Sequence, residues 1–191
     1  MSGKRGFVIV INGASSSGKS TLARAVQDLF AEPLLKFGLD VFLDGDILPM
    51  RQIRDGRVDW ETLRPSVMDG FYDCLAVLTE AGNNLIVDHV FESSTDFDRL
   101  TDAIRGSFTF IVGLHCDLHE LERRETARGD RGSGDARADV GTVHQFCTYD
   151  LELHSDAATV EENADALIDA WSASARRRRS EAVRLDTVDP L

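Results

Sequence analysis

The sequence has few of the features expected of a secreted or membrane-spanning protein. Its three cysteines, Cys74, Cys116 and Cys147, are scattered and odd in number, which argues against a disulfide framework and indicates a reducing compartment. The longest apolar run near the N-terminus, Phe7–Ile11, is too short for the core of a signal peptide or for a membrane span. We therefore expect a cytoplasmic protein without a membrane partner.

An excess of basic residues is also absent. The formal net charge is −12, whereas a groove for DNA or RNA is normally basic, so polymeric nucleic acid is not an expected partner. The exception is Arg176–Arg179, which could be an interaction tail but is more typical of the solvated end of a helix. Zinc is not expected either, because the cluster from His115 to His119 lacks a second pair of ligands at zinc spacing.

No linker, internal repeat or long low-complexity segment divides the chain, so we expect one domain over residues 1–175 and a frayed tail over 176–191. Continuous apolar runs predict parallel strands that are covered on both faces. These runs are Phe7–Ile11, Leu34–Leu39, Leu85–Phe91, Phe108–Leu114 and Tyr149–Leu153. Helical patterns lie at Ser20–Phe30, Thr62–Ala81, Asp117–Arg128, Val140–Cys147 and Thr159–Ser174. The alternation predicts a three-layer α/β domain of about five parallel strands, which binds ligands at the carboxyl ends of the strands.

The strongest motif in the sequence is a phosphate-binding loop. The run Gly13-Ala14-Ser15-Ser16-Ser17-Gly18-Lys19-Ser20 matches G-x-x-x-x-G-K-[ST] and is followed by Thr21. Its glycines allow a tight turn whose N–H groups point at phosphates, Lys19 reaches the β- and γ-phosphates, and the Ser20 hydroxyl binds Mg²⁺. A strand before the motif and an amphipathic helix after it favour this interpretation over a flexible Gly/Ser turn, so ATP and Mg²⁺ are the expected cofactors.

Two aspartates are candidates for the remaining polar roles in phosphoryl transfer. Asp40 follows a short strand and could orient or deprotonate an acceptor hydroxyl, with Asp44 and Asp46 as nearby rivals. Asp88 ends a buried strand, where a carboxylate could hold the water shell of Mg²⁺ or the acceptor. The alternative for Asp40 and for Asp88 is an ordinary cap or turn residue.

A third group of candidates is a set of arginines that resembles a lid. Arg124 and Arg128 lie four residues apart on one helical face, and Arg131 follows in a segment that contains Gly129, Gly132 and Gly134. Such a segment could close over the phosphates and exclude water. The alternative is that Glu120–Arg124 and Glu125–Arg128 are surface ion pairs, which contribute little. His89, His144, Trp60, Phe71 and Tyr72 are interpreted first as core residues, and the three aromatic residues could also line an acceptor pocket.

The motifs resemble those of the chloramphenicol phosphotransferase family. The resemblance rests on Phe37-Gly38-Leu39-Asp40, on the eight residues from Arg124 to Arg131, on Val143-His144 and on Tyr149–Leu153, and it spans about residues 7–172. It implies a P-loop fold of the nucleoside- and shikimate-kinase type with an arginine-rich lid at about 124–139. It also implies an ATP-dependent kinase that phosphorylates a hydroxyl of chloramphenicol and confers resistance, with Asp40 as the base. Asp88-His89 departs from the family's adjacent acidic pair and alters the acceptor side.

The expected catalytic residues are therefore Asp40, Lys19, Arg128 and Arg131, with Arg124 and Arg128 at the nucleotide and Ser20 and Asp88 at the metal. Two alternatives stay open. One is a kinase for another small metabolite, a nucleoside or a different antibiotic. The other is a nucleotide-dependent switch, although the chain contains no N-K-x-D guanine signature.

Overall fold

The computed structural model describes residues 4–44, 47–128 and 134–186. Its centre is a sheet of five parallel strands in the order β2-β3-β1-β4-β5. The strands are β1 (Val8–Asn12), β2 (Leu35–Gly38), β3 (Leu85–His89), β4 (Thr109–His115) and β5 (Leu151–His154). Each lies within two residues of an apolar run in the sequence, so the predicted parallel α/β fold is confirmed.

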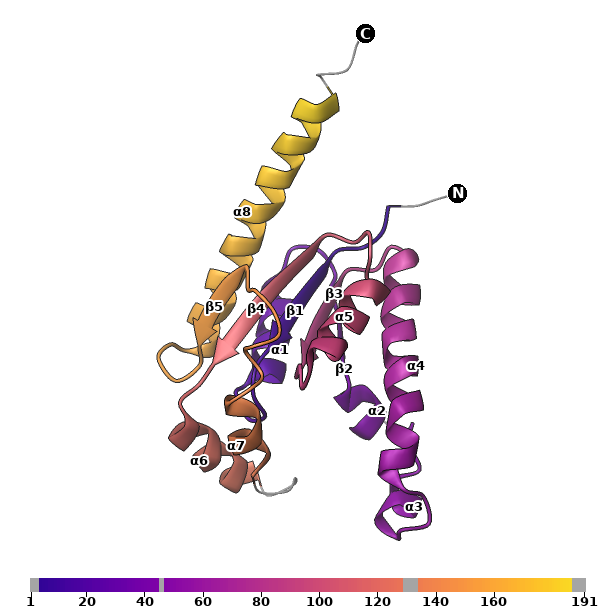
Figure 1. Ribbon diagram of the computed structural model, residues 1–191. Coiled ribbons are helices and arrows are strands. Elements are labelled where there is room, and N and C mark those ends of the chain that lie inside the picture. Colours follow the sequence, from indigo (N-terminus) through magenta and orange to yellow (C-terminus); the bar gives the residue numbers. More distant parts are fainter. Residues whose placement is uncertain (1–3, 45–46, 129–133, 187–191) are drawn as a thin grey trace.

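Alternation along the central strands divides the core into two layers, one on each face of the sheet. Ile9, Ile11 and Ile86 pack with α1 (Lys19–Leu29) and α8 (Val160–Asp186) on one face. Val10 and Val87 pack with α4 (Trp60–Glu80) and α5 (Ser94–Ala103) on the other face. Both faces are therefore covered by helices (Figure 1), which explains why the strands read as continuous apolar runs.

The short helices gather at the end of the molecule where the strands end. They are α2 (Asp40–Asp44), α3 (Met50–Arg54), α6 (Leu118–Arg128) and α7 (Asp135–Val140). In Figure 1, α6 and α7 lie on one side of this end and α2 and α3 on the other. These helices and the loop after β1 surround the carboxyl edge of the sheet, where ligands of parallel sheets bind.

The helix predicted over Val140–Cys147 is wrong, because α7 ends at Val140 and turns follow. Glu125 of α6 accepts hydrogen bonds from the N–H groups of Gly134 and Ala136, which fixes the start of α7 upstream of the apolar pattern. The buried Asn12 side chain donates to the carbonyl of Val143 and holds the following segment in a non-helical path. Partners from distant parts of the chain override the local helical pattern here.

Helix α8 is longer than the pattern over Thr159–Ser174 predicts. It continues through Arg176–Arg179 to Asp186 and extends past the sheet (Figure 1). The four arginines are exposed, as the interpretation as a solvated helix end predicted, and Arg178 lies 4.6 Å from the centre of the Phe108 ring. Within the described part of the chain, no helix is long and apolar enough to cross a membrane.

Candidate functional site

The phosphate-binding loop connects β1 to α1 at the centre of the sheet. Gly18 has φ of 95° and precedes the first residue of α1, a left-handed conformation that a residue with a side chain rarely adopts. The Lys19 ammonium donates to the carbonyls of Gly13 and Ala14, both at 2.8 Å, and so spans the loop. The N-terminus of α1, with its partial positive charge, faces the same turn, which makes the loop an anion-binding cradle.

Asn12, the last residue of β1, lies directly before the phosphate-binding loop and was not identified from the sequence. Its amide donates to the Tyr149 hydroxyl at 2.7 Å and its oxygen accepts from the N–H of Phe91 at 3.0 Å. The Tyr149 hydroxyl also shares a hydrogen bond of 2.7 Å with Nδ1 of His144. Burial and the neighbouring His115 lower the pKa of His144 to about 4, so its ring is neutral and can accept. Through Tyr149, His144 is thus linked to Asn12, the residue that precedes the loop.

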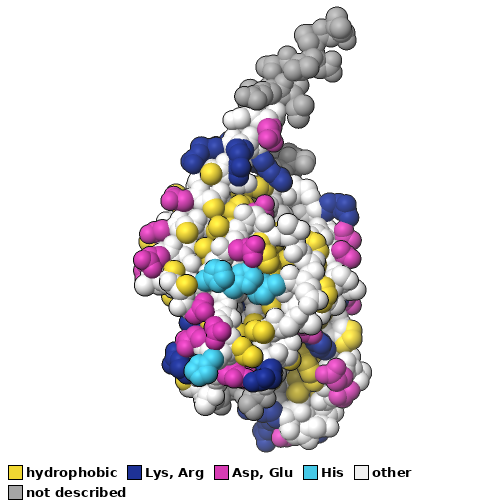
Figure 2. Space-filling view, turned by 60° about the vertical axis from the view of Figure 1, so that its left-hand side comes forward, with side chains coloured by type: hydrophobic (Ala, Val, Ile, Leu, Met, Phe, Trp, Pro, Cys, Tyr) yellow, Lys and Arg dark blue, Asp and Glu magenta, His cyan; other side chains and the backbone are white. Residues whose placement is uncertain are grey.

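Three histidines gather beside this support on one face of the molecule (Figure 2). The His115 ring stacks on His144 and His154 at centroid distances of 3.9 and 5.1 Å. Among the described residues, no group of three or more His, Cys, Asp or Glu side chains is arranged to hold a metal ion. We therefore assign no metal to this cluster.

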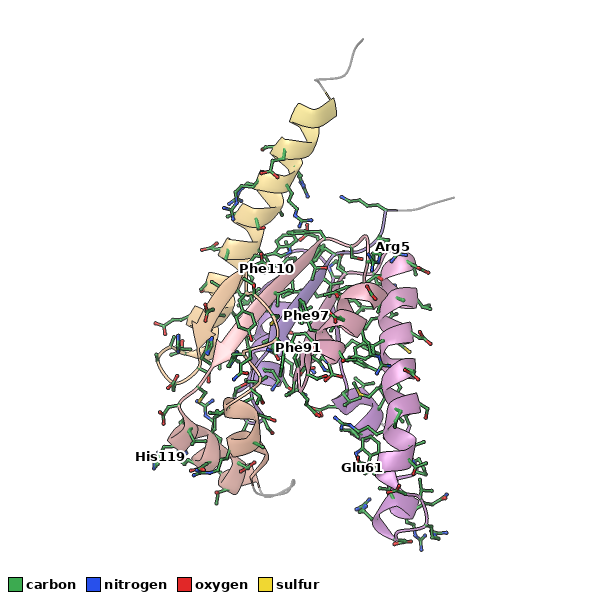
Figure 3. All side chains as sticks on the ribbon, in the orientation of Figure 1. Arg5, Glu61, Phe91, Phe97, Phe110 and His119 are labelled. Atoms are coloured by element: carbon green, nitrogen blue, oxygen red, sulfur yellow. The ribbon has the colours of Figure 1, made fainter. Side chains whose placement is uncertain are left out.

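A cavity of about 1410 Å³ runs along the carboxyl edge of the sheet. Its walls include α6, which carries His119, and the first turn of α4, which carries Glu61 (Figure 3). Most of the residues predicted for the site border this one space: Ser15, Ser16, Gly18, Lys19, Ser20, Thr21, Asp40, Asp88 and Arg124. Gly13, Ala14 and Ser17 belong to the same loop but do not border the cavity. The structure thus brings the phosphate cradle and both predicted aspartates to a common cavity.

Asp88 lies directly against the cradle. Its Oδ2 accepts a hydrogen bond of 2.5 Å from the Ser20 hydroxyl, and the Lys36 ammonium is 3.2 Å from the same oxygen. The other oxygen, Oδ1, is buried without a hydrogen-bond partner. A Cβ at Gly38 would lie only 1.8 Å from Oδ1, so the carboxylate occupies space that glycine leaves free.

Ser20 and Asp88 together fit a magnesium site. Both offer oxygen atoms at the edge of the phosphate cradle, and oxygen ligands are those that Mg²⁺ prefers. Mg²⁺ keeps several waters and commonly takes one or two protein oxygens together with substrate phosphates, so a third protein ligand is not required.

His89 points to the opposite face of the sheet from Asp88, because side chains alternate along β3. Its ring lies 5.4 Å from that of Phe71, and its Nε2 is 3.2 Å from the Tyr72 hydroxyl. Burial lowers the pKa of His89 to about 4, so the ring is neutral. His89 therefore belongs to the aromatic core, as one interpretation predicted, and also borders the cavity.

Asp40 begins α2, two residues after β2 ends, and is half-buried at the wall of the cavity. The apolar residues Leu39, Leu43, Met50 and Trp60 border the same cavity. Arg64 closes this side and donates to both oxygens of Glu92 at 2.6 and 2.7 Å. The rivals of Asp40 are not placed, because Asp46 and the side chain of Asp44 lie outside the described residues.

On the other side of the cavity, Arg124 connects α6 to the cradle. Its guanidinium donates to Glu120, to the carbonyl and hydroxyl of Ser155, and to the carbonyl of Ser17 at 3.4 Å. The contact with the loop goes beyond the surface ion pair that was the alternative. The Arg128 side chain and Arg131 lie outside the described residues, so their predicted lid role stays a prediction.

Asp139 of α7 was not identified from the sequence, yet its carboxylate lies on the cradle. Its Oδ2 accepts a hydrogen bond of 2.8 Å from the backbone N–H of Ser15. An N–H of this loop is a donor that phosphate would use, so the carboxylate competes with a bound phosphate both sterically and by charge.

We expect Asp139→Asn to bind nucleoside diphosphate and triphosphate about fivefold more tightly, because it removes a negative charge beside the phosphates. Titration calorimetry with ADP and with a non-hydrolysable ATP analogue would measure the change. Asp165→Asn on exposed α8 is the matched control and should bind as the wild type does. Unchanged or weaker binding by Asp139→Asn would show that the carboxylate does not oppose phosphate.

The comparison with known proteins also points to the chemistry of phosphate groups, which the phosphate-binding loop indicates. The family described as "Chloramphenicol phosphotransferase-like protein" matches residues 6–172. The Mycobacterium tuberculosis protein named "Putative O-phosphotransferase Rv2636" is 33% identical over an alignment that covers 88% of this chain and 83% of the relative. The sequence resemblance to this family is thereby confirmed.

Several solved structures with a similar fold are kinases. The Mycobacterium tuberculosis APS kinase aligns with a TM-score of 0.65 and 17% identity, over 89% of this chain and 99% of its own. The gluconokinase from Sinorhizobium meliloti gives 0.65 and 16%, over 93% and 98%. Shikimate kinase from Acinetobacter baumannii gives 0.64 and 11%, over 90% and 96%. At such identities the likeness shows the fold alone. With its phosphate-binding loop and the match over residues 6–172, the chain belongs to the chloramphenicol phosphotransferase-like family.

Proposed function

We propose that the protein transfers the γ-phosphoryl group of ATP to a hydroxyl of a small molecule, with chloramphenicol or a related antibiotic as the first candidate acceptor. The observation that carries the proposal is that Asp40, Lys19 and the Ser20–Asp88 pair border one cavity. A kinase needs this combination of phosphate cradle, metal ligands and a carboxylate for the acceptor.

In this mechanism Lys19 leaves the carbonyls of Gly13 and Ala14 and binds the β- and γ-phosphates. Asp40 accepts the hydrogen bond of the acceptor hydroxyl and takes its proton as the oxygen attacks the γ-phosphorus, while the bond from that phosphorus to the β-phosphate oxygen breaks and ADP leaves. Ser20 and Asp88 would hold Mg²⁺, directly and through water, and the ion would neutralise charge on the phosphates. Arg124 lies beside the cradle, and Arg128 and Arg131 are proposed to complete the lid that excludes water.

Features of the acceptor side support a small, partly apolar substrate. Leu39, Leu43, Met50 and Trp60 offer apolar surface in the cavity that Asp40 borders, while Arg64 and Glu92 offer polar groups. His89, where the family resemblance leads us to expect an acidic residue, changes this side of the pocket. A different hydroxylated acceptor is the second candidate for that reason.

The test is ATP consumption with and without chloramphenicol, combined with mass spectrometry of the small molecule. We expect a product heavier by one phosphoryl group. If chloramphenicol stays unmodified, a panel of related antibiotics, sugar acids and nucleosides should contain an acceptor. If no compound in the panel is phosphorylated and the protein instead binds another protein in a nucleotide-dependent manner, the proposed kinase activity is contradicted and a nucleotide-dependent switch is favoured.

A further inference from the structure

Lys36 is a further basic side chain that borders the cavity, and the mechanism above does not use it. It lies on β2, an edge strand, yet only 15% of its side chain is exposed. Its ammonium borders the cavity and is 3.2 Å from Oδ2 of Asp88. This is the oxygen that also accepts the Ser20 hydroxyl, so a hydroxyl and an ammonium share one carboxylate oxygen.

The register of the sheet builds this contact into the fold. Lys36 pairs with Ile86 and Gly38 pairs with Asp88, two residues further along both strands. Because side chains alternate along a strand, Lys36 and Gly38 share a face of β2, next to the face of β3 that carries Asp88. Gly38 leaves room for the Asp88 carboxylate, and the side chain of Lys36, two residues earlier on the same face of β2, reaches this carboxylate. The position of Asp88 is thus fixed from α1, from β2 and by the missing Cβ of Gly38.

A cation near a carboxylate oxygen lowers the attraction of that oxygen for a second cation. A divalent ion between Ser20 and Asp88 would therefore meet opposition from Lys36. Asp88 is 4% exposed at its side chain, so water screens this interaction little. The Lys36 ammonium would thus weaken the binding of the ion to the protein itself. The ion would then bind and dissociate together with the nucleotide phosphates.

We propose that Lys36 is a positioning residue that holds Oδ2 of Asp88 beside Ser20 and weakens binding of a divalent cation to the nucleotide-free protein. The proposal rests on the proposed function only in giving Asp88 a place near the metal. Replacing Lys36 should raise the affinity for the metal ion and lower the turnover rate. A loss of stability alone would not produce this pair of changes.

The experiment compares Lys36→Met with Lys36→Arg, using Mn²⁺ as the probe in place of Mg²⁺. Mn²⁺ binding to the nucleotide-free protein is measured by electron paramagnetic resonance. We expect Lys36→Met to bind Mn²⁺ about fivefold more tightly, because the competing charge is gone. Lys36→Arg should keep the wild-type affinity. In the double variant Lys36→Met with Asp88→Asn the gain should disappear.

Two further measurements make the outcome decisive. If Lys36→Met does not fold by circular dichroism, Lys36→Gln serves in its place with the same expectation. Arg105→Met, which removes an exposed cation paired with Asp102 far from the cavity, should leave Mn²⁺ binding unchanged.

Once an acceptor is known, kcat of Lys36→Met should fall about tenfold while KM for ATP changes little, and Lys36→Arg should restore kcat.

Unchanged or weaker Mn²⁺ binding by Lys36→Met or Lys36→Gln would overturn the proposal. This result differs from failure of the proposed kinase reaction, which would appear as absence of turnover in the wild type. The Mn²⁺ measurement needs neither ATP nor an acceptor, so it tests Lys36 even if no acceptor is phosphorylated.

Discussion

Asp40→Ala is expected to reduce phosphoryl transfer by about 10²- to 10⁴-fold, while the affinity for nucleotide stays within about twofold. The carboxylate lies at the start of α2 and borders the cavity without being part of the phosphate-binding loop. In the proposed mechanism, removing it takes away the group that would receive the acceptor's proton and leaves the cradle intact. Mass spectrometry of the product would measure transfer, and calorimetry with ADP would measure nucleotide affinity.

The controls for this prediction use other aspartates. Asp44→Asn and Asp46→Asn test the two rivals for the role of base, and both should retain most of the transfer rate. Asp69→Asn on the exposed side of α4, where Asp69 pairs with Arg99, tests for a general effect of charge. If Asp40→Ala loses nucleotide affinity in proportion to transfer, Asp40 supports the fold of the site and is not the base.

Lys19→Ala is expected to weaken ATP binding and to lower the transfer rate, each by at least about tenfold, because one residue serves both steps. Its ammonium donates to the carbonyls of Gly13 and Ala14, so it is positioned over the loop. Without it the phosphates lose a charge-assisted contact in the ground state and in the transition state. ADP titration and single-turnover transfer would separate the two losses.

Lys4→Ala is the matched control, since Lys4 is exposed and lies before β1, away from the cavity. It should behave as the wild type in both assays. Wild-type transfer by Lys19→Ala would contradict the interpretation of Gly13–Ser20 as the phosphate cradle.

Part of the site could be predicted from the sequence, because the groups concerned are set by local sequence. The loop from Gly13 to Ser20 needs only a strand before it and a helix after it, and both were readable as an apolar run and an amphipathic pattern. Asp40 and Asp88 follow apolar runs, and in a parallel sheet such positions meet at one edge. The contact of Arg124 with the cradle was anticipated by its spacing, though not the carbonyls that it binds.

Other features depend on partners that no local pattern announces. Asp139 caps the N–H of Ser15, and Lys36 shares Asp88 with Ser20, across 124 and 52 residues of chain respectively. In the sequence, Asp139 and Lys36 themselves would be interpreted as ordinary surface residues. The segment after Val140 carries a helical pattern, yet it is held in turns by the buried Asn12.

By itself, then, the sequence determined the five strands, the layers and the phosphate cradle, since continuous burial and a short motif impose them through local periodicity and steric freedom at glycine. Only the tertiary structure decided which charges meet in the cavity. Hydrogen bonds and ion pairs between strands and helices depend on register and on side-chain direction, and these are fixed when the sheet assembles and its two faces are covered.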